Sequence, residues 1–328
     1  MIYFFIIICN IFFLTFFKKI SKFINVFDLP DNKRKIHTEK ISLLGGLIFL
    51  FNIICYLLYE FLINKEKIFK IFYFQETLSI FIFFFSSILI FLIGYIDDKI
   101  KLSARVRLIL LSFIILINLL VNSDLNISLI KLSFLNSFSI ENFSFFWTFL
   151  CLLLFINAFN FFDGINLQSA GFIYAICFFF LYKNIFFDFF VVIFIANTFF
   201  IYLNYYSKTF LGNSGSFFLP FLFGSLFISS YNNTSLVADE IVVLMLIPGW
   251  DLLRLFFQRI LKKTSPMTAD NNHIHHYLIK KFSNTKAALI IQALIWIPFF
   301  LSQYIGYINL LLIAQTLCYF LIIAKYKN

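Results

Sequence analysis

Long apolar runs separated by short polar stretches follow one another along almost the whole chain. An α-helix needs about 20 mostly apolar residues to cross the hydrocarbon core of a bilayer, and most of the runs approach that length. The boundary between the sixth and seventh runs depends only on Asn184 to Phe187. Hydropathy therefore predicts an all-α, polytopic integral membrane protein, a single transmembrane domain over 1–328, with eleven spans near residues 2–17, 43–63, 77–96, 104–122, 143–159, 170–186, 188–205, 217–231, 238–257, 287–303 and 307–324.

The distribution of basic residues predicts how these spans are oriented. An odd number of spans puts the two termini on opposite sides of the membrane, and loops rich in Lys and Arg face the cytoplasm. This places the N-terminus outside and the C-terminus in the cytoplasm. The net charge of +10 is mostly this signal, so no nucleic-acid partner is needed to explain it. The loops on one side hold 21 of the 26 Lys and Arg residues, in 18–42, 99–107, 206–216, 254–286 and the tail from 325.

Composition supports the same class. Hydrophobic residues make up 62% of the 328 residues and charged residues only 13%, and a soluble domain of this size needs much less apolar surface. The five cysteines all lie in apolar stretches without CxxC spacing, which argues against a disulfide framework or a cysteine metal site. The first seventeen residues lack a basic segment and a small-residue cleavage site, so we expect a retained span there.

Five unusual polar clusters all fall on the predicted cytoplasmic side. All four histidines of the chain lie in the first and last of these clusters. Random scatter would put some clusters on the outer side, so their common side favours a shared cytoplasmic site. The clusters occupy residues 28–37, 97–98, 157–166, 212–216 and 270–276.

The second cluster is the carboxylate pair Asp97 and Asp98, at the end of an apolar run. Each would cost roughly 2.5–3.5 kcal/mol in the middle of a bilayer, so we expect the pair at the membrane edge, facing protein. Two like charges about 5 Å apart repel by roughly 3 kcal/mol at an effective dielectric constant of 20. A divalent cation or a cationic substrate clamp would relieve that repulsion; the alternative is a hydrated helix cap.

Two further clusters carry groups suited to cations or phosphates. Asn157, Asn160 and Asp163 are spaced by three, so on a helix they spread over about 120° of one face before Gly164 lets the backbone turn. Their oxygens suit Mg²⁺, although asparagines in membranes also form hydrogen bonds between helices. The small residues of 212–216 could offer backbone amides to phosphate or form an ordinary turn.

The two histidine-bearing clusters are cationic. The first holds Arg34, Lys35 and His37, which could meet an anionic substrate or lipid headgroups, or only anchor the chain by the positive-inside rule. The last holds His273, His275 and His276 after Asp270. Imidazoles favour zinc, but no cysteine lies nearby, and phosphate binding agrees better with the other clusters.

Together, these motifs resemble the polytopic polyprenyl-phosphate N-acetylhexosamine-1-phosphate transferases, a family of the glycosyltransferase 4 type. It includes the bacterial enzymes that start O-antigen and common-antigen synthesis and the phospho-muramoyl-pentapeptide transferase of peptidoglycan. Five stretches carry the resemblance in the family's order over about residues 28–276: DLPDNKRKIH followed by Gly45-Gly46, GYIDD, NAFNFFDGIN, LGNSGS and SPMTADNNHIHH.

The resemblance implies a reaction and a place for it. A polyprenyl (undecaprenyl) phosphate attacks a UDP-N-acetylhexosamine and gives polyprenyl-diphosphate-sugar and UMP, the first step of a cell-surface glycan such as an O-antigen or other polysaccharide, in lipopolysaccharide or cell-wall biogenesis. The site would face the cytoplasm from a bacterial inner membrane, with Mg²⁺ or Mn²⁺ as cofactor, and the family allows a homodimer. Phosphoryl transfer between anions requires mainly charge neutralisation and positioning.

The resemblance also implies residue roles, carried over by matching position. It places the catalytic carboxylates at Asp97, Asp98 and Asp163, and the metal ligands at Asn160, Asn213 and Asp98. Substrate binding would fall to Arg34, Lys35, His37, Asn157, His273, His275 and His276.

Departures from the family pattern leave alternatives open. Asn213 stands where the family usually has Asp, which removes a formal charge from a metal position, and Asn166-Leu167 replaces a second Asp-Gly. One alternative is therefore an impaired member that binds lipid phosphate as a scaffold. The other is a transporter of lipid-linked glycans, for which Asp251 and Arg254 are the main charges within a span.

Overall fold

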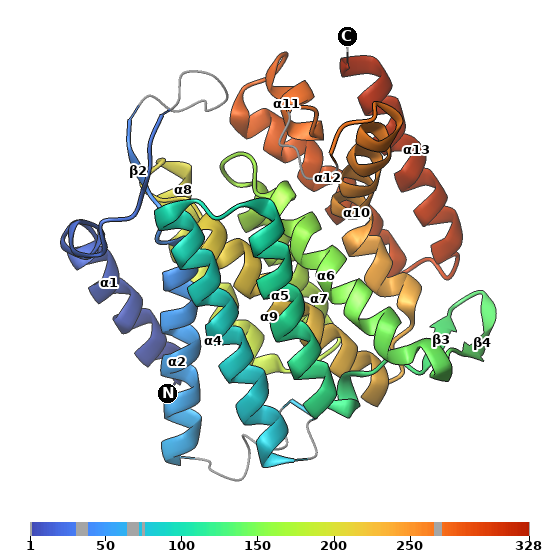
Figure 1. The fold of residues 1–328 in the computed structure, drawn as a ribbon, viewed down its shortest axis with the longest axis horizontal. Coiled ribbons are helices and arrows are strands. Elements are labelled where there is room, and N and C mark those ends of the chain that lie inside the picture. Colours follow the sequence, from blue (N-terminus) through green and yellow to red (C-terminus); the bar gives the residue numbers. More distant parts are fainter. Residues whose placement is uncertain (1, 31–38, 64–71, 74–75, 266–270, 328) are drawn as a thin grey trace.

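The computed structural model describes residues 2–30, 39–63, 72–73, 76–265 and 271–327 of the chain. Within them the chain is a bundle of long helices with two small hairpins (Figure 1). The long helices are α1 (Ile2–Ile24), α2 (Gly45–Ile63), α4 (Thr77–Ile100), α5 (Ala104–Val121), α6 (Ser144–Phe162), α7 (Gln168–Tyr182), α8 (Phe187–Tyr205), α9 (Gly212–Asn233), α10 (Ala238–Leu261), α12 (Asn284–Ser302) and α13 (Ile308–Tyr326).

The remaining elements are short. Helix α11 (Ile274–Ile279) carries the last two histidines. Strands β1 (Phe27–Asp28) and β2 (Ile41–Ser42) pair antiparallel with Phe27 opposite Ser42, and β3 (Leu129–Leu132) and β4 (Leu135–Ser139) pair with Leu129 opposite Ser139. A 3₁₀ turn at Ser123–Leu125 precedes β3, and a second one at Glu141–Phe143 follows β4.

The eleven long helices lie at the eleven places that hydropathy predicts. Nine of them are long and apolar enough to span a membrane. The other two are α7, with 15 residues, and α10, which carries five charged residues. The all-α polytopic class is confirmed, while the number of spans and their orientation stay predictions.

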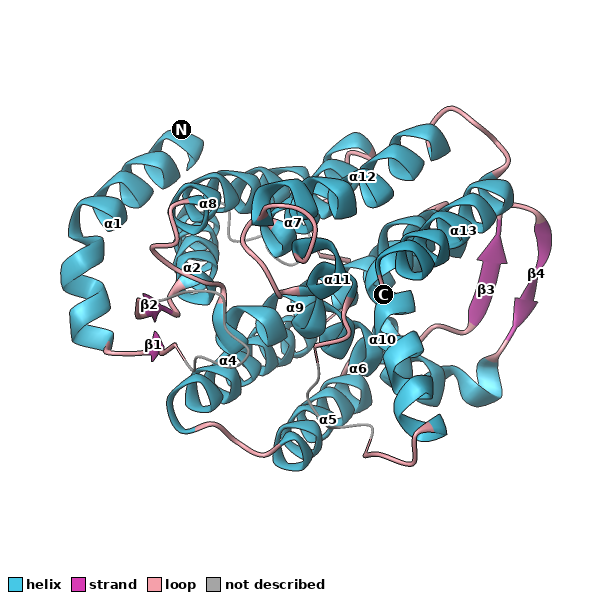
Figure 2. Ribbon diagram, turned by 90° about the horizontal axis from the view of Figure 1, so that it is seen from above, coloured by secondary structure: helices cyan, strands magenta, loops and turns pink. Residues whose placement is uncertain are grey.

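Helix α9 lies at the centre of the bundle, enclosed by α2, α4 and α6 (Figure 2). Its apolar residues are distributed all round the helix, and every residue of its most apolar stretch is buried, as expected of a helix without a polar face. Glycines permit the close packing at its start: a Cβ at Gly46 would lie 2.7 Å from the Gly215 Cα atom. The first turn of α9 is therefore fixed between neighbouring helices.

The start of α2 is joined to the loop that precedes α9. The amides of Gly45 and Gly46 donate to the carbonyls of Phe210 and Leu211, both at 2.9 Å. Thr209 is buried and its hydroxyl accepts from the Leu44 amide at 3.0 Å. The glycine pair after the first polar cluster thus lies directly beside the fourth cluster.

The predicted orientation can be tested by labelling single cysteines in a cysteine-free background from either side of the membrane. Ser103 and Ser283 are exposed and belong to loops predicted to be cytoplasmic, whereas exposed Ser123 belongs to an outer loop. Cysteines at positions 103 and 283 should react only with a reagent that reaches the cytoplasmic side. Labelling of all three from the same side would contradict the predicted topology.

Candidate functional site

The carboxylate of Asp98, from the end of α4, caps the first turn of α9. Its Oδ1 accepts the Asn213 amide at 2.8 Å, and its Oδ2 accepts the Ser214 amide at 3.1 Å. The positive end of a helix dipole favours an anion at this place. Gly212 has φ +75°, and a Cβ there would lie 2.7 Å from Asp98 Oδ2. Residues 212–216, expected as a small-residue loop, are the helix start that receives this carboxylate.

Asp97 has different partners from its neighbour. Its Oδ1 accepts the Leu102 amide at 2.7 Å and its Oδ2 pairs with Arg107 Nη1 at 3.0 Å. Asp97 is buried, and its two contacts join the end of α4 to the start of α5. Arg107 relieves the like-charge repulsion expected from the sequence.

Asn160 brings α6 to the same turn of α9. Its side-chain nitrogen donates to Asn213 Oδ1 at 3.1 Å and to Ser216 Oγ at 2.7 Å. Asn157, one turn earlier, donates to the Leu153 carbonyl of its own helix at 2.7 Å. Asp98, Asn160, Asn213 and Ser216 are therefore joined by direct contacts at the start of α9. Within the described residues, the hydrogen bond of the Asn157 side chain goes to its own helix and does not join it to this group.

The third and fifth clusters meet at Gly164. Asp163 ends α6 and bonds Ser169, and burial raises the pKa of its carboxyl to about 6 although Ser169 acts the other way. A Cβ at Gly164 would lie 2.7 Å from the His275 Nδ1 atom. The ring of His275 thus packs against the bare backbone after α6, a contact that only glycine allows.

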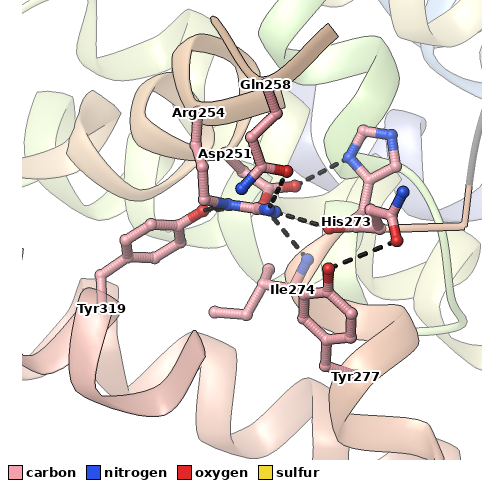
Figure 3. A network of polar contacts seen from close by, with 8 residues as sticks. Asp251, Arg254, Gln258, His273, Ile274, Tyr277 and Tyr319 are labelled. Atoms are coloured by element: carbon pink, nitrogen blue, oxygen red, sulfur yellow. Dashed lines mark hydrogen bonds and ion pairs between the residues drawn. The ribbon is translucent and has the colours of Figure 1, made fainter. Parts of the chain in front are cut away.

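The histidine segment rests on α10. His273 Nδ1 lies 2.8 Å from Asp251 Oδ2 (Figure 3), and the rings of His273 and His275 are parallel with centroids 5.4 Å apart. His275 is buried and His276 is half-buried, 4.2 Å from the His275 ring. The sequence missed this anchor: Asp251 and Arg254 were visible only as charges three apart in an apolar run.

Some predicted site residues are outside the described part of the chain. These are Arg34, Lys35 and His37 of the first cluster, and Asp270 next to the histidines. Among the described residues, no group of three or more His, Cys, Asp or Glu side chains is placed to hold a metal ion. The oxygens at the start of α9 come instead from one carboxylate, two amides and a hydroxyl.

Comparison with known proteins addresses the family. Residues 80–231 match the model of glycosyl transferase family 4, a stretch that runs from α4 to α9 and contains Asp98, Asn160 and Asn213. This match supports the family expected from the motifs. A Bacillus subtilis (strain 168) protein named as a probable undecaprenyl-phosphate N-acetylglucosaminyl 1-phosphate transferase is 26% identical over 315 residues, with 87% of this chain and 82% of the relative covered. The histidine segment lies beyond the matched stretch and inside the described part of the bundle.

The pKa shifts of His275 and Asp163 predict how the stability of the fold depends on pH. Burial, with His276 and His273 close by, lowers the pKa of His275 well below its usual value. Below about pH 6.5, His275 therefore binds a proton in the unfolded chain but not in the folded chain. As the pH falls further, the free energy of unfolding decreases by up to about 1.4 kcal/mol per pH unit. Asp163 acts with the opposite sign below pH 6, because the folded state holds its carboxyl proton.

His275→Gln isolates the contribution of the histidine. The thermal unfolding midpoint should be measured at pH 7.5 and at pH 5.5. Its decrease between these two values should be smaller in the variant than in the wild type, because glutamine does not bind a proton in the unfolded chain. Equal falls in the two proteins would contradict a buried neutral His275.

Proposed function

We propose that this protein transfers an N-acetylhexosamine-1-phosphate from a UDP-sugar to a polyprenyl phosphate and releases UMP, at the cytoplasmic face of a bacterial inner membrane. An oxygen of the lipid phosphate forms a bond to the sugar-bearing phosphorus, and the bond from that phosphorus to UMP breaks with its electron pair leaving on UMP. The name of the Bacillus subtilis relative supports this activity. The product would begin a cell-surface glycan.

One observation carries the proposal: three motifs from different helices meet at the buried start of α9. Asp98 comes from α4, Asn160 from α6, and Asn213 and Ser216 from α9 itself. The positive end of a helix favours anions, and here two of its amides already hold the Asp98 carboxylate. The arrangement supports phosphoryl transfer, in which the protein mainly positions and neutralises anions.

The donor set also suits a hard divalent cation. Carboxylate, amide and hydroxyl oxygens are the ligands that Mg²⁺ takes in proteins. Asp98, Asn160 and Asn213 would hold it, with Ser216 next to them. When bound, Mg²⁺ or Mn²⁺ would supply positive charge to the phosphates.

The remaining groups act on the substrates in this proposal. Asp163 and the half-buried Asn157 would contact the nucleotide, and the histidines, which pack against the end of α6, would bind phosphate. Asp97, tied to Arg107, would set the position of Asp98 more than it touches the substrate. Among the described residues, the charges suggested for a transporter pathway, Asp251 and Arg254, pair with each other at 2.8 Å, which gives the transporter alternative no support.

The test is release of UMP by purified protein supplied with polyprenyl phosphate and a panel of UDP-sugars. EDTA should abolish turnover, and Mg²⁺ or Mn²⁺ should restore it, because the proposed ligands are oxygens. Zinc alone should not restore it. Activity that survives EDTA would exclude the proposed metal, and binding of both substrates without UMP release would favour the scaffold alternative.

Asn213→Asp is a companion variant for the metal site. The carboxylate keeps an acceptor for the Asn160 amide and restores the charge usual in the family. Activity should be retained or raised, with half-maximal rate at a lower Mg²⁺ concentration than in the wild type. Complete inactivation would contradict the placement of residue 213 beside the metal.

A further inference from the structure

A buried polar network joins the histidine segment to the two helices behind it (Figure 3). Its members are Asp251 and Arg254 on α10, Tyr319 on α13, and His273. Asp251 and His273 are 2% and 7% exposed. Charges at such depth are costly unless they are paired and hydrogen-bonded, so a network of this kind needs a reason.

The two oxygens of Asp251 have different partners. Oδ1 accepts from Arg254 Nη2 at 2.8 Å, from the Tyr319 hydroxyl at 2.9 Å and from the Ile274 amide at 3.1 Å. Oδ2 faces His273 Nδ1 at 2.8 Å. Because a carboxylate can only accept, Nδ1 carries the proton, and Nε2 is the ring nitrogen left for a ligand.

The backbone on both sides of His273 is fixed by the same network. Arg254 Nη2 also donates to the Asn272 carbonyl at 2.6 Å, and Asp251 accepts the amide of Ile274. The ring itself contacts Phe161 near the end of α6, with centroids 5.5 Å apart, and the rings of His275 and His276. Its backbone, its Nδ1 atom and its ring neighbours are therefore specified.

We propose that Asp251 is a positioning residue, which keeps a proton on Nδ1 of His273 and so aims Nε2 at a phosphate of the substrates, to which the doubly protonated ring donates a hydrogen bond. Arg254 and Tyr319 hold Asp251 in the orientation that this requires. The phosphate contact rests on the proposed function, whereas the state of the ring does not. Groups that orient a metal-ligating histidine commonly affect activity by about 10- to 100-fold when they are changed, and we expect an effect of similar size for a histidine that contacts phosphate.

Asp251→Asn separates the two oxygens. Three donors face Oδ1, so the remaining oxygen of the asparagine stays on that side and its NH₂ group turns toward His273. That group donates, so His273 Nδ1 must lose its proton, which excludes both the Nδ1–H tautomer and the doubly protonated ring. The variant retains the shape of the network and reverses one hydrogen bond.

Two measurements on full-length protein labelled with ¹⁵N-histidine test the proposal. Ring ¹⁵N spectra, with His273 assigned by its loss in His273→Gln, should show a protonated Nδ1 in the wild type and a bare Nδ1 in Asp251→Asn. UMP release should show kcat/KM reduced by about 10- to 100-fold in Asp251→Asn. A bare Nδ1 in the wild type overturns the proposal even if no variant folds.

The matched control is Asp239→Asn, the same change at the other end of α10. Asp239 is buried and its Oδ1 accepts the Ser133 amide at 3.0 Å, away from the site. It should leave the His273 spectrum unchanged and kcat/KM within about twofold of the wild type. An equal loss in both variants means that a buried carboxylate merely stabilises α10, and this overturns the positioning role.

Tyr319→Phe separates the network from the histidine bond. It removes one donor to Oδ1 and leaves Oδ2 on His273, so Nδ1 should stay protonated.

If the wild type releases no UMP with any UDP-sugar, the proposed function fails while the spectra still decide whether Asp251 sets the state of His273. If the ring spectrum of His273 is unchanged in Asp251→Asn, Asp251 does not set the state of His273, whatever the activity.

Discussion

Replacing Asp98 by Asn is expected to lower UMP release by about 100- to 1,000-fold, the range seen when one preorganised electrostatic group is removed from an active site. The carboxylate receives two amides of α9, one on each oxygen. An asparagine retains one acceptor oxygen, but its NH₂ group then faces the second backbone amide, so two donors meet and that hydrogen bond is lost. The negative charge next to the proposed metal is lost as well. The rate should be measured at saturating Mg²⁺, together with the thermal unfolding midpoint.

The neighbouring residue provides the control. Asp97→Asn removes the same charge one position earlier, where the carboxylate pairs with Arg107 and the Leu102 amide. This change removes the charge of a buried carboxylate that accepts from the partly exposed Arg107 and from an amide, so it should lower stability by about 1–3 kcal/mol and reduce the rate less than Asp98→Asn does. Equal rate losses with unchanged stability in both variants would show that the two carboxylates are equivalent.

The second large effect is expected at Gly94, where α4 crosses the first turn of α9. A Cβ at this position would lie 2.5 Å from the Asn213 carbonyl carbon and 2.5 Å from the Ser214 Cα atom. Both are backbone atoms of a buried helix, so the two helices must move apart. Gly94→Ala should lower the free energy of unfolding by about 1–3 kcal/mol, as overpacking of a core does. It should also reduce the rate at least tenfold, because Asp98 lies one turn further along α4.

Gly249→Ala is the matched change for this prediction. Gly249 is also inside a long helix, α10, but a Cβ there meets nothing within 4 Å. Alanine favours helix over glycine by about 0.8–1.0 kcal/mol, so this variant should be neutral or slightly stabilised. If Gly94→Ala unfolds at the same temperature as Gly249→Ala and keeps its rate, the close crossing of α4 and α9 is wrong.

The helices were predictable because hydropathy acts locally. Each long apolar run must satisfy its own backbone hydrogen bonds in a bilayer, and a helix is the way to do so. The weak boundary at Asn184 to Phe187 is a real break, since Asn184 and Phe186 both have positive φ and α8 begins at Phe187. The charges of α10 show the limit of this reasoning, because hydropathy cannot tell a pathway charge from a paired one.

The site was predictable as a set of motifs but not as a geometry. The sequence brought Asp98, Asn160 and Asn213 together only through resemblance, and their contacts depend on the close approach of α4, α6 and α9. Asp97 and Asp98 are adjacent residues of the same type, so the sequence does not assign them different roles. Their roles differ because Arg107 pairs with Asp97 and the start of α9 contacts Asp98. The partners of Asp251 come from residues 254, 273, 274 and 319, so no local pattern could have indicated them.

The enclosure of α9 also affects how this chain can diverge. All of the most apolar window of α9 is buried, whereas only 22% is buried in the corresponding windows of α1 and α13. Substitutions that suit a thicker or thinner bilayer can therefore accumulate on the outer helices without moving the first turn of α9. A deep mutational scan should find α1 and α13 permissive to exchange among Phe, Ile and Leu and α9 intolerant of it. The chain can thus adapt to a new membrane through changes in α1 and α13 while α9 keeps the site unchanged.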